Sequence, residues 1–312
     1  MSSTPVDEDP SRRTERAVNA AVLAGRSRGL KVTDPVVLHD VFSVVVHLVP
    51  APVVARVPVV PPPALRDDVE AQLDRQRVEL DVVHRLLARE LPVVRPYVNE
   101  PILQSGFCLT LWHYVDHRRV AQPDYKRNCQ LTADLHAEMA ALPTRLPFLG
   151  PIHSTVPQAL DELTARPDLI DVLDLERARR EWELLAPVLT DQSEFERRFP
   201  GIPVQVIHGD SPPYNIITDA RRELHSDFED ACVGPIEWDL TMLNPECVAA
   251  YDAAARGRGL RPVNPDVLRL MESARLLQVV ACLALVPQLP KLAKGLSPVV
   301  QQWRSRPLPA TP

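Results

Sequence analysis

The chain has 312 residues, of which 45% are hydrophobic and 24% are charged, and its formal net charge is −6. This is ordinary globular composition, and an acidic chain gives no reason to expect a nucleic-acid partner. Five scattered cysteines without a Cys-x-x-Cys pair favour free thiols in a reducing compartment. The polar start lacks a signal-peptide core, and the longest apolar stretch, residues 276–289, is too short to span a bilayer. We therefore expect a cytoplasmic protein with no membrane partner.

The first third of the chain predicts a strand-rich region that carries one long helix. Residues 1–15 are polar and are predicted to be a disordered tail, and a short helix is expected around residues 14–24. Apolar side chains recur at helical spacing over residues 64–90, which predicts an amphipathic helix. Segments rich in β-branched or aromatic residues predict strands at residues 36–49, 53–60, 93–98 and 107–114.

Helical patterns dominate after a polar linker at residues 116–124. Helices are predicted at residues 125–142, 156–165, 171–195, 238–255, 265–286 and 289–304. Short strands are predicted at residues 204–207, 215–218 and 223–227, and residues 307–312 are predicted to be a frayed tail. The sequence thus predicts an α+β protein with a small strand-rich lobe, residues 16–114, and a larger helical lobe, residues 115–306.

Polar side chains follow two of the short strands in the second lobe. Asp210 and Asn215 lie on one loop after an apolar run, and Asp227 ends the next strand pattern. One carboxylate can accept the proton of an attacking hydroxyl, while an amide oxygen and a second carboxylate suit Mg²⁺. Taken singly, Asp and Asn are also typical turn residues, but the three together favour phosphoryl transfer. His208 is expected to orient the loop through hydrogen bonds.

Three motifs in order resemble the aminoglycoside phosphotransferase family. They are His208-Gly209-Asp210 with Asn215, then Asp227-Phe228-Glu229-Asp230, then Glu237-Trp238-Asp239-Leu240 after Gly234-Pro235. The family has the two-lobed protein-kinase-like fold and includes choline and homoserine kinases. The resemblance implies that the first lobe binds the nucleotide and that the second carries the catalytic and substrate residues.

The resemblance also assigns roles to single residues. Asp210 would be the catalytic base, and Asn215 and Asp227 would be ligands of Mg²⁺, with ATP or GTP as co-substrate. His208, Glu229 and Asp239 would support the site, Asp239 from a helix that buttresses it.

The first lobe matches the family less closely. The family carries a strand lysine that contacts the α- and β-phosphates and is held by a glutamate on the long helix. Arg56 stands at that place here, and Glu79 is the best-placed partner, although Arg56 could also be a surface charge. Residues 38–43, which would cover the phosphates, contain no glycine, so backbone contact with phosphate is weakened.

The end of the first lobe offers a hinge for the adenine. The resemblance implies that Leu111, His113 and Tyr114 hold the base through backbone hydrogen bonds, although a core strand explains the same residues. Acidic side chains after the metal motif could line a site for a cationic substrate or could form a solvated face. They are Glu229, Asp230, Glu237, Glu246 and Asp252.

We therefore expect a small-molecule kinase that transfers the γ-phosphoryl group to a hydroxyl of a small acceptor. One alternative is a kinase-like nucleotide-binding protein without transfer activity, which Arg56 and the glycine-free loop favour. The other is a metal-dependent phosphoesterase that uses His208, Asp210, Asn215 and Asp227, although two-metal hydrolases need more converging ligands.

Overall fold

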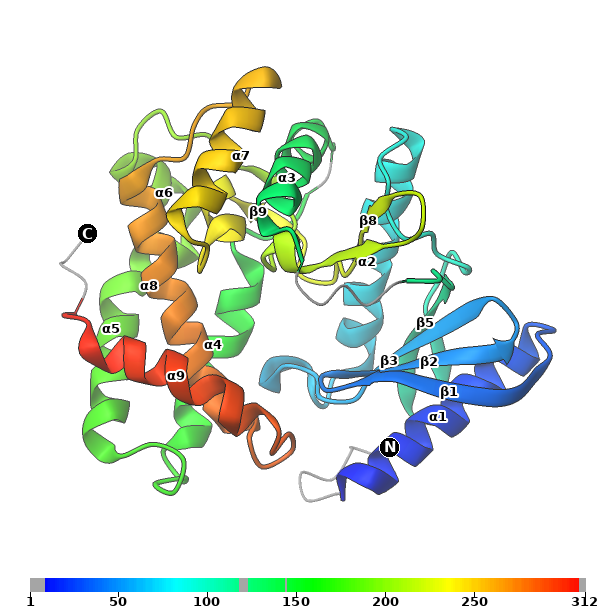
Figure 1. The fold of residues 1–312 in the computed structure, drawn as a ribbon. Helices are drawn as coiled ribbons and strands as arrows, with labels where there is room; N and C mark the ends of the chain where they lie inside the picture. Colours follow the sequence, from blue (N-terminus) through cyan, green and yellow to red (C-terminus); the bar gives the residue numbers. More distant parts are fainter. Residues whose placement is uncertain (1–8, 118–122, 144, 309–312) are drawn as a thin grey trace.

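The computed structural model describes residues 9–117, 123–143 and 145–308. A five-stranded sheet with two helices forms the N-terminal lobe, and helices dominate the C-terminal lobe (Figure 1). The N-terminal elements are α1 (Pro10–Ser27), β1 (Val32–Asp40), β2 (Ser43–Pro50), β3 (Val53–Pro58), η1 (Pro63–Leu65), α2 (Val69–Ala88), β4 (Ile102–Gln104) and β5 (Phe107–His113). The predicted α+β fold is confirmed.

The helix α1 begins earlier than predicted. Asp9 caps it by accepting hydrogen bonds from the backbone N–H of Ser11 and Arg12, and Pro10 occupies the first turn, where proline is favoured. Residues 10–15 are therefore helical, which corrects the predicted tail, and residues 1–8 lie outside the described residues. Four alanines form the buried face that packs on the sheet: Ala17, Ala20, Ala21 and Ala24.

The sheet is antiparallel, with strand order β1-β2-β3-β5-β4. On β3, Val53, Ala55 and Val57 are fully buried beneath α1. Because side chains alternate along a strand, Val54 and Arg56 face the other way, toward α2 and the C-terminal lobe. This alternation is what delivers a charged side chain from the sheet to the space between the lobes.

Residues 36–40 and 43–49 lie in strands as predicted, and the first of these strands, β1, begins earlier, at Val32. Two other predicted segments of this lobe differ in the structure. Residues 93–98 form no strand, because Pro92 and Pro96 cannot donate to a ladder; instead the N–H of Val94 donates to the carbonyl of His225 at 2.9 Å. The helix α2 starts at Val69, capped by Asp68, and a separate 3₁₀ turn covers residues 63–65.

The C-terminal lobe is built from two helical groups. Its elements are α3 (Tyr125–Met139), α4 (Gly150–Leu163), α5 (Val172–Thr190), α6 (Gln192–Arg198), β6 (Gln205–Ile207), η2 (Pro212–Tyr214), β7 (Ile216–Thr218), β8 (Glu223–His225), β9 (Cys232–Gly234), η3 (Ile236–Leu240), α7 (Pro245–Gly257), α8 (Pro265–Ala281), η4 (Cys282–Leu285) and α9 (Leu292–Ser305). Helices α4, α5, α8 and α9 share one core, and α3 packs on α7 in another. Between them, β6 pairs with β9 and β7 with β8.

Two segments that were each predicted to be one helix form two separate elements in the structure. The predicted helix at residues 171–195 breaks at Asp191, whose side chain accepts from the N–H of Ser193 and so begins α6. The predicted helix at residues 238–255 separates into η3 and α7, and Asn244 caps the latter. The strand β9 was not predicted.

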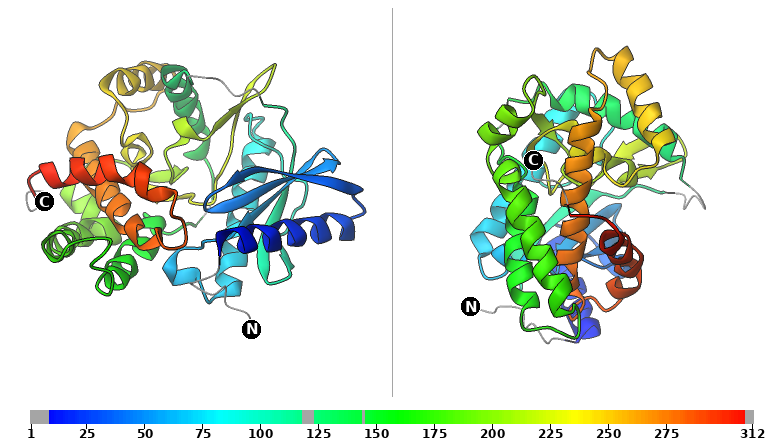
Figure 2. Two further views of the ribbon diagram at one scale, coloured as in Figure 1. Left: turned by 60° about the horizontal axis from the view of Figure 1, so that its bottom comes forward. Right: turned by 90° about the vertical axis from the view of Figure 1, so that its left-hand side faces the viewer.

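The lobes touch on the side away from the hinge. Leu289 is buried in the core of the N-terminal lobe, so the chain between α8 and α9 crosses to that lobe (Figure 2). A guanidinium nitrogen of Arg66 lies 2.9 Å from the carboxylate of Glu162 on α4. No helix in the described ranges is long and apolar enough to cross a membrane. The predicted linker, residues 116–124, lies largely outside the described residues.

Candidate active site between the two lobes

Side chains of the 3₁₀ helix η3 hold the loop after β6 in place. The carboxylate of Asp239 accepts hydrogen bonds from the backbone N–H of His208 and of Gly209, each at 2.8 Å. The indole N–H of Trp238 donates to the carbonyl of Gly209 at 2.7 Å. Asp239 is fully buried and also lies 3.0 Å from His136, so its role is to fix the loop rather than to meet a substrate.

Gly209 allows two loops to touch. Its φ is 87°, in the left-handed region, and a Cβ placed on it would lie 1.8 Å from the carbonyl oxygen of Asp230. Only glycine fits such an approach without moving one of the loops. The loop that carries Asp210 is therefore held in register with the loop that carries Asp227.

His208 links the same two loops through its ring. The backbone N–H of Asp210 donates to Nδ1 at 3.3 Å, and Nε2 lies 2.9 Å from the carbonyl oxygen of Ser226. If Nδ1 accepts, Nε2 carries the proton and donates it to Ser226. The fully buried imidazole thus bridges Asp210 and the residue before Asp227, in agreement with the orienting role expected for it.

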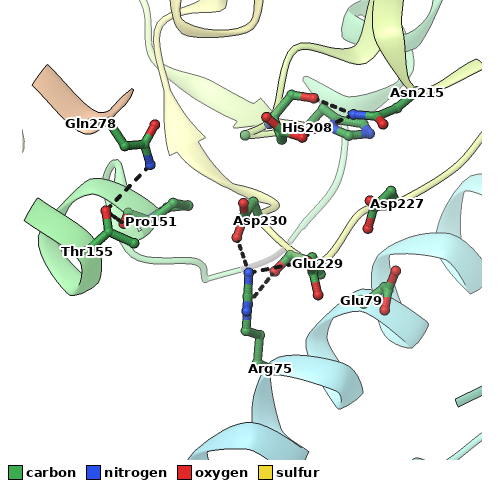
Figure 3. A network of polar contacts seen from close by, with 12 residues as sticks. Arg75, Glu79, Pro151, Thr155, His208, Asn215, Asp227, Glu229, Asp230 and Gln278 are labelled. Atoms are coloured by element: carbon green, nitrogen blue, oxygen red, sulfur yellow. Dashed lines mark hydrogen bonds and ion pairs between the residues drawn. The ribbon is translucent and has the colours of Figure 1, made fainter. Parts of the chain in front are cut away.

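Asp210 and Asn215 lie together at the cleft. The amide nitrogen of Asn215 donates to the backbone carbonyl of Asp210 at 2.7 Å and to its carboxylate at 3.2 Å. The side chain of Asp210 is 48% exposed, and a guanidinium nitrogen of Arg275 lies 3.7 Å from it. Figure 3 shows Asn215 above Asp227, with Glu79 below on the helix α2.

Arg56 joins the two lobes through three carboxylates. Its guanidinium lies 2.6 Å from Glu79 on α2 and 3.1 Å from Glu229, and it forms an ion pair with Asp227. The predicted partner of Arg56 was Glu79, and the structure brings the two together. Because Arg56 is only 11% exposed, it is a buried cation of the cleft rather than a surface charge.

The electrostatics of this cluster follow from three carboxylates that share one guanidinium. Although burial acts against it, the surrounding carboxylates raise the pKa of Arg56 above its ordinary value. Burial raises the pKa of Glu79 to about 8 against the charge of Arg56, and it raises the pKa of Asp227 in the same way. Burial is the main cause of the two carboxyl shifts, and the neighbouring carboxylates add to it. Three carboxylates around one guanidinium favour a metal cation beside Asp227.

A second arginine of the cleft was not foreseen from the sequence. Arg75 reaches from α2 to the loop of the C-terminal lobe, where Nε donates to the carbonyl of Glu229 at 3.2 Å and the guanidinium pairs with Asp230 (Figure 3). Arg75 precedes Glu79 by four residues, so the two share a helix face, and that spacing was the available signal. Arg275 left no comparable signal, because it comes from the distant helix α8.

Two cavities meet at the predicted metal motif. One has a volume of about 380 Å³ and is lined by Glu79, Trp112, His113 and Tyr114 among others. The other, of about 420 Å³, is lined by Asp210 and by residues of α4 and α8. Arg56, Asp227, His39 and Val45 line both cavities. The two cavities therefore adjoin at the Arg56–Asp227 ion pair.

Comparison with known proteins assigns the chain to a family. A sequence profile of the phosphotransferase enzyme family matches residues 43–277, most of the chain. The chain belongs to this family. The match includes parts of both lobes and every residue of the cluster around Arg56.

Solved structures share the fold at low sequence identity. The GDP and kanamycin complex of APH(2″)-IIIa superposes with a TM-score of 0.58 at 15% identity, over 92% of this chain and 97% of that one. A choline/ethanolamine kinase family protein from Mesorhizobium loti gives 0.56 at 14%, over 95% and 96%. The choline kinase LicA from Streptococcus pneumoniae gives 0.55 at 14%, over 93% of both chains. A search of curated proteins found no significant match.

In this member of the phosphotransferase family, Leu111 is the one of the three predicted hinge residues that does not line the cavity. The side chain of Leu111 is fully buried in the sheet core, and its carbonyl accepts from the N–H of Tyr97 at 2.8 Å. The alternation of β5 turns Trp112, not Leu111, toward the cavity. The N–H groups of His113 and Tyr114 donate to Arg95 and Pro52, each at 2.9 Å, so these two N–H groups are already engaged.

The acidic residues considered for a cationic substrate all have other partners. Glu229 and Asp230 pair with the arginines of the cleft. Glu237 is buried and pairs with Arg261 at 2.7 Å, Glu246 pairs with Lys126 at 2.5 Å, and Asp252 accepts from the N–H of Val263 at 2.8 Å. Four of these five carboxylates therefore pair with basic side chains of the protein itself, and Asp252 accepts from a backbone N–H.

Proposed function

We propose that this protein is a small-molecule kinase that transfers the γ-phosphoryl group of ATP or GTP to a hydroxyl of its acceptor. The observation that supports the proposal is that two cavities share Arg56 and Asp227 in their walls, and that Asp210 lines only the second of them. A nucleotide in the cavity at the hinge would present its phosphates to Arg56. An acceptor in the other cavity would present its hydroxyl to Asp210.

The nucleotide side offers an apolar space and one strong cation. Trp112, Val83 and Phe228 line the cavity and suit the faces of a base. The guanidinium of Arg56 can donate two parallel hydrogen bonds to phosphate oxygens while Glu79 keeps it oriented. Tyr114 stacks on His47 with ring centroids 3.8 Å apart, which stiffens the hinge edge of this cavity.

The residues present fit a magnesium ion. Asn215 uses its amide nitrogen on Asp210, which leaves its amide oxygen free to act as a ligand, and Arg56 contacts only Oδ1 of Asp227. Amide and carboxylate oxygens are the hard ligands that Mg²⁺ prefers, and the excess negative charge of the cluster favours a divalent cation. When bound with the nucleotide, the ion supplies positive charge to the β- and γ-phosphates.

Asp210 is the group that supports catalysis of the transfer. Its carboxylate accepts the acceptor's O–H proton while the hydroxyl oxygen forms a bond to the γ-phosphorus. The bond from that phosphorus to the bridging oxygen of the β-phosphate breaks, and the nucleoside diphosphate leaves. Asn215 contacts the carboxylate itself, while His208 and Asp239 hold the backbone of the loop that carries it, so little reorientation is needed during the reaction.

The test is a nucleotide-consumption screen over aminoglycosides, macrolides, amino alcohols and sugars, run with the wild type and with Asp210→Ala. We expect Asp210→Ala to lower kcat by roughly 10²- to 10⁴-fold, as for the loss of a general base, with its thermal unfolding and nucleotide affinity retained. Unchanged turnover in this variant would refute the role of Asp210. Magnesium-dependent nucleotide binding without transfer to any compound would favour the non-transferring alternative instead.

A further inference from the structure

The cavity beside Asp210 is walled mainly by apolar residues from both lobes. The N-terminal lobe contributes the segment after β3, and the C-terminal lobe contributes α4, α8 and η4. The apolar wall includes Val60, Pro62, Pro63, Ala159, Ala281 and Leu285. Val60, Ala159 and Ala281 are almost fully buried, so this wall is part of the packed structure and not a surface of mobile chains.

Each carboxylate that lines this cavity has an arginine beside it. Asp230 pairs with Arg75, and Glu229 lies 3.1 Å from Arg56, which also pairs with Asp227. Asp210 lies 3.7 Å from Arg275. Although Arg56 is shared by Asp227 and Glu229, an ammonium group that enters the cavity would meet a fixed positive charge next to each of these carboxylates.

The arginine beside Asp210 is itself held in place. Its guanidinium lies 4.0 Å over the ring of Trp238, Nε donates to the hydroxyl of Thr241 at 3.2 Å, and another nitrogen donates to Gln278 at 2.8 Å. Arg275 therefore cannot swing away to expose Asp210 without losing a stacking contact and two hydrogen bonds. A cationic acceptor would have to place its charge against this guanidinium.

We propose that the acceptor is an uncharged hydroxyl compound with an apolar body, and not a polyamine. The apolar body lies against the wall formed by α4, η4 and the segment after β3, and the hydroxyl reaches Asp210. The volume of about 420 Å³ is enough for a compound of drug-like size. This inference rests on the proposed phosphotransfer, whose acceptor class it names.

The experiment uses acceptors in matched pairs that separate the apolar body from the amine. Hexyl glucoside is compared with hexyl glucosaminide, and glucose with glucosamine; a second scaffold compares 4-butylbenzyl alcohol with 4-(4-aminobutyl)benzyl alcohol, and kanamycin serves as a polycation. Transfer is measured as kcat/KM with Mg²⁺ and nucleotide. We expect the hexyl or butyl group to raise kcat/KM at least tenfold and the amine to lower it at least tenfold.

Variants of α4 test whether this wall sets the preference. Ala159→Glu places a carboxylate without an arginine partner in the wall, and Thr155→Glu does so at a half-buried position one turn earlier. Each should lower kcat/KM for the neutral member at least tenfold and reduce the penalty for the amine member. Gln158→Glu adds the same charge to the exposed face of α4 and should change neither value. Nucleotide affinity, measured by calorimetry, should stay constant in all three.

The outcomes separate this inference from the proposed function. Equal or better transfer to the amine members would overturn the inference while phosphotransfer stands. Unchanged selectivity in Ala159→Glu and Thr155→Glu, with both proteins folded by thermal unfolding, would also overturn it. Transfer to no compound in the panel overturns it as well, and loss of nucleotide binding in the wild type would overturn the proposed function together with it.

Discussion

Replacing Gly209 by alanine should separate the two loops of the site while leaving their side chains unchanged. The added Cβ would lie 1.8 Å from the carbonyl oxygen of Asp230, whereas real Cβ contacts of this kind stay above 3.0 Å. The contact must therefore open by about 1.2 Å, the difference between these two distances. The neighbour is backbone and cannot rotate away, so the loop with Asp210 has to move relative to the loop with Asp227.

The expected magnitude has two parts. A non-glycine residue at a φ of 87° costs roughly 1–2 kcal/mol of folding free energy, since the left-handed region disfavours a Cβ. A displacement of about 1 Å at reacting groups costs roughly 10²-fold in rate, which is near 3 kcal/mol of activation free energy. We therefore expect Gly209→Ala to lower kcat about 100-fold, with a smaller loss of stability.

The assay is steady-state transfer to an acceptor from the screen, together with thermal unfolding of the same preparations. Gly201→Ala is the matched control, because Gly201 has a φ of 81° but nothing lies within 4 Å of the added Cβ. Gly201→Ala should therefore lose folding stability because of its positive φ, but its kcat should stay at the wild-type value. Wild-type kcat in Gly209→Ala, or an equal loss of kcat in Gly201→Ala, would refute the argument that contact with Asp230 holds the loops in register.

Two further changes test the charges that hold the site. Arg56→Met should cost about 3–5 kcal/mol in chemical denaturation, since Glu79 is 1% exposed and loses its partner, and Arg56→Met/Glu79→Met should recover part of that loss. Equal stability of the single and double variants would contradict this. Asp239→Asn should destabilise the protein by roughly 1–3 kcal/mol at neutral pH, because an amide N–H then faces backbone N–H donors. Although burial opposes it, His136 lowers the pKa of Asp239, so this carboxylate stabilises the fold above its unfolded pKa, near 3.8. The difference between wild type and Asp239→Asn should narrow as the pH falls from about 4 through the lowered pKa, and a constant difference in urea titrations would argue against an ionised Asp239.

The sequence predicted the parts of the site that depend on neighbouring residues. His208, Asp210 and Asn215 share one loop, so their proximity follows from the chain itself. The pairing of Arg56 with Glu79 was predictable because a strand and the next long helix usually pack together. In contrast, Arg275 reaches Asp210 from a helix far along the chain, and only tertiary packing determines that contact.

The direction in which the side chains of a strand point was harder to predict than the position of the strand. The strand β5 was expected at residues 107–114, and Leu111 was expected to hold the adenine through its backbone. In the structure the side chain of Leu111 lies in the core that α1 shares, and its carbonyl accepts a hydrogen bond from Tyr97. Strand alternation shows which residues face the cleft only when the packing on the other face is known, and the sequence did not show that α1 packs there.

Having arginine instead of lysine at position 56 changes how the carboxylates of the cleft are paired. A lysine presents one point charge, whereas the guanidinium of Arg56 contacts Glu79, Asp227 and Glu229 at the same time. The guanidinium that pairs with three carboxylates would also have to bind the phosphates, and Asp227 would also have to bind the metal. If Arg56 binds the phosphates and Asp227 binds the metal, the nucleotide and magnesium would be expected to enter together, because both would have to break the same Arg56–Asp227 ion pair. This coupling follows from the ion pair between Arg56 and Asp227. Arginine in place of the family's lysine therefore does not by itself argue against catalysis.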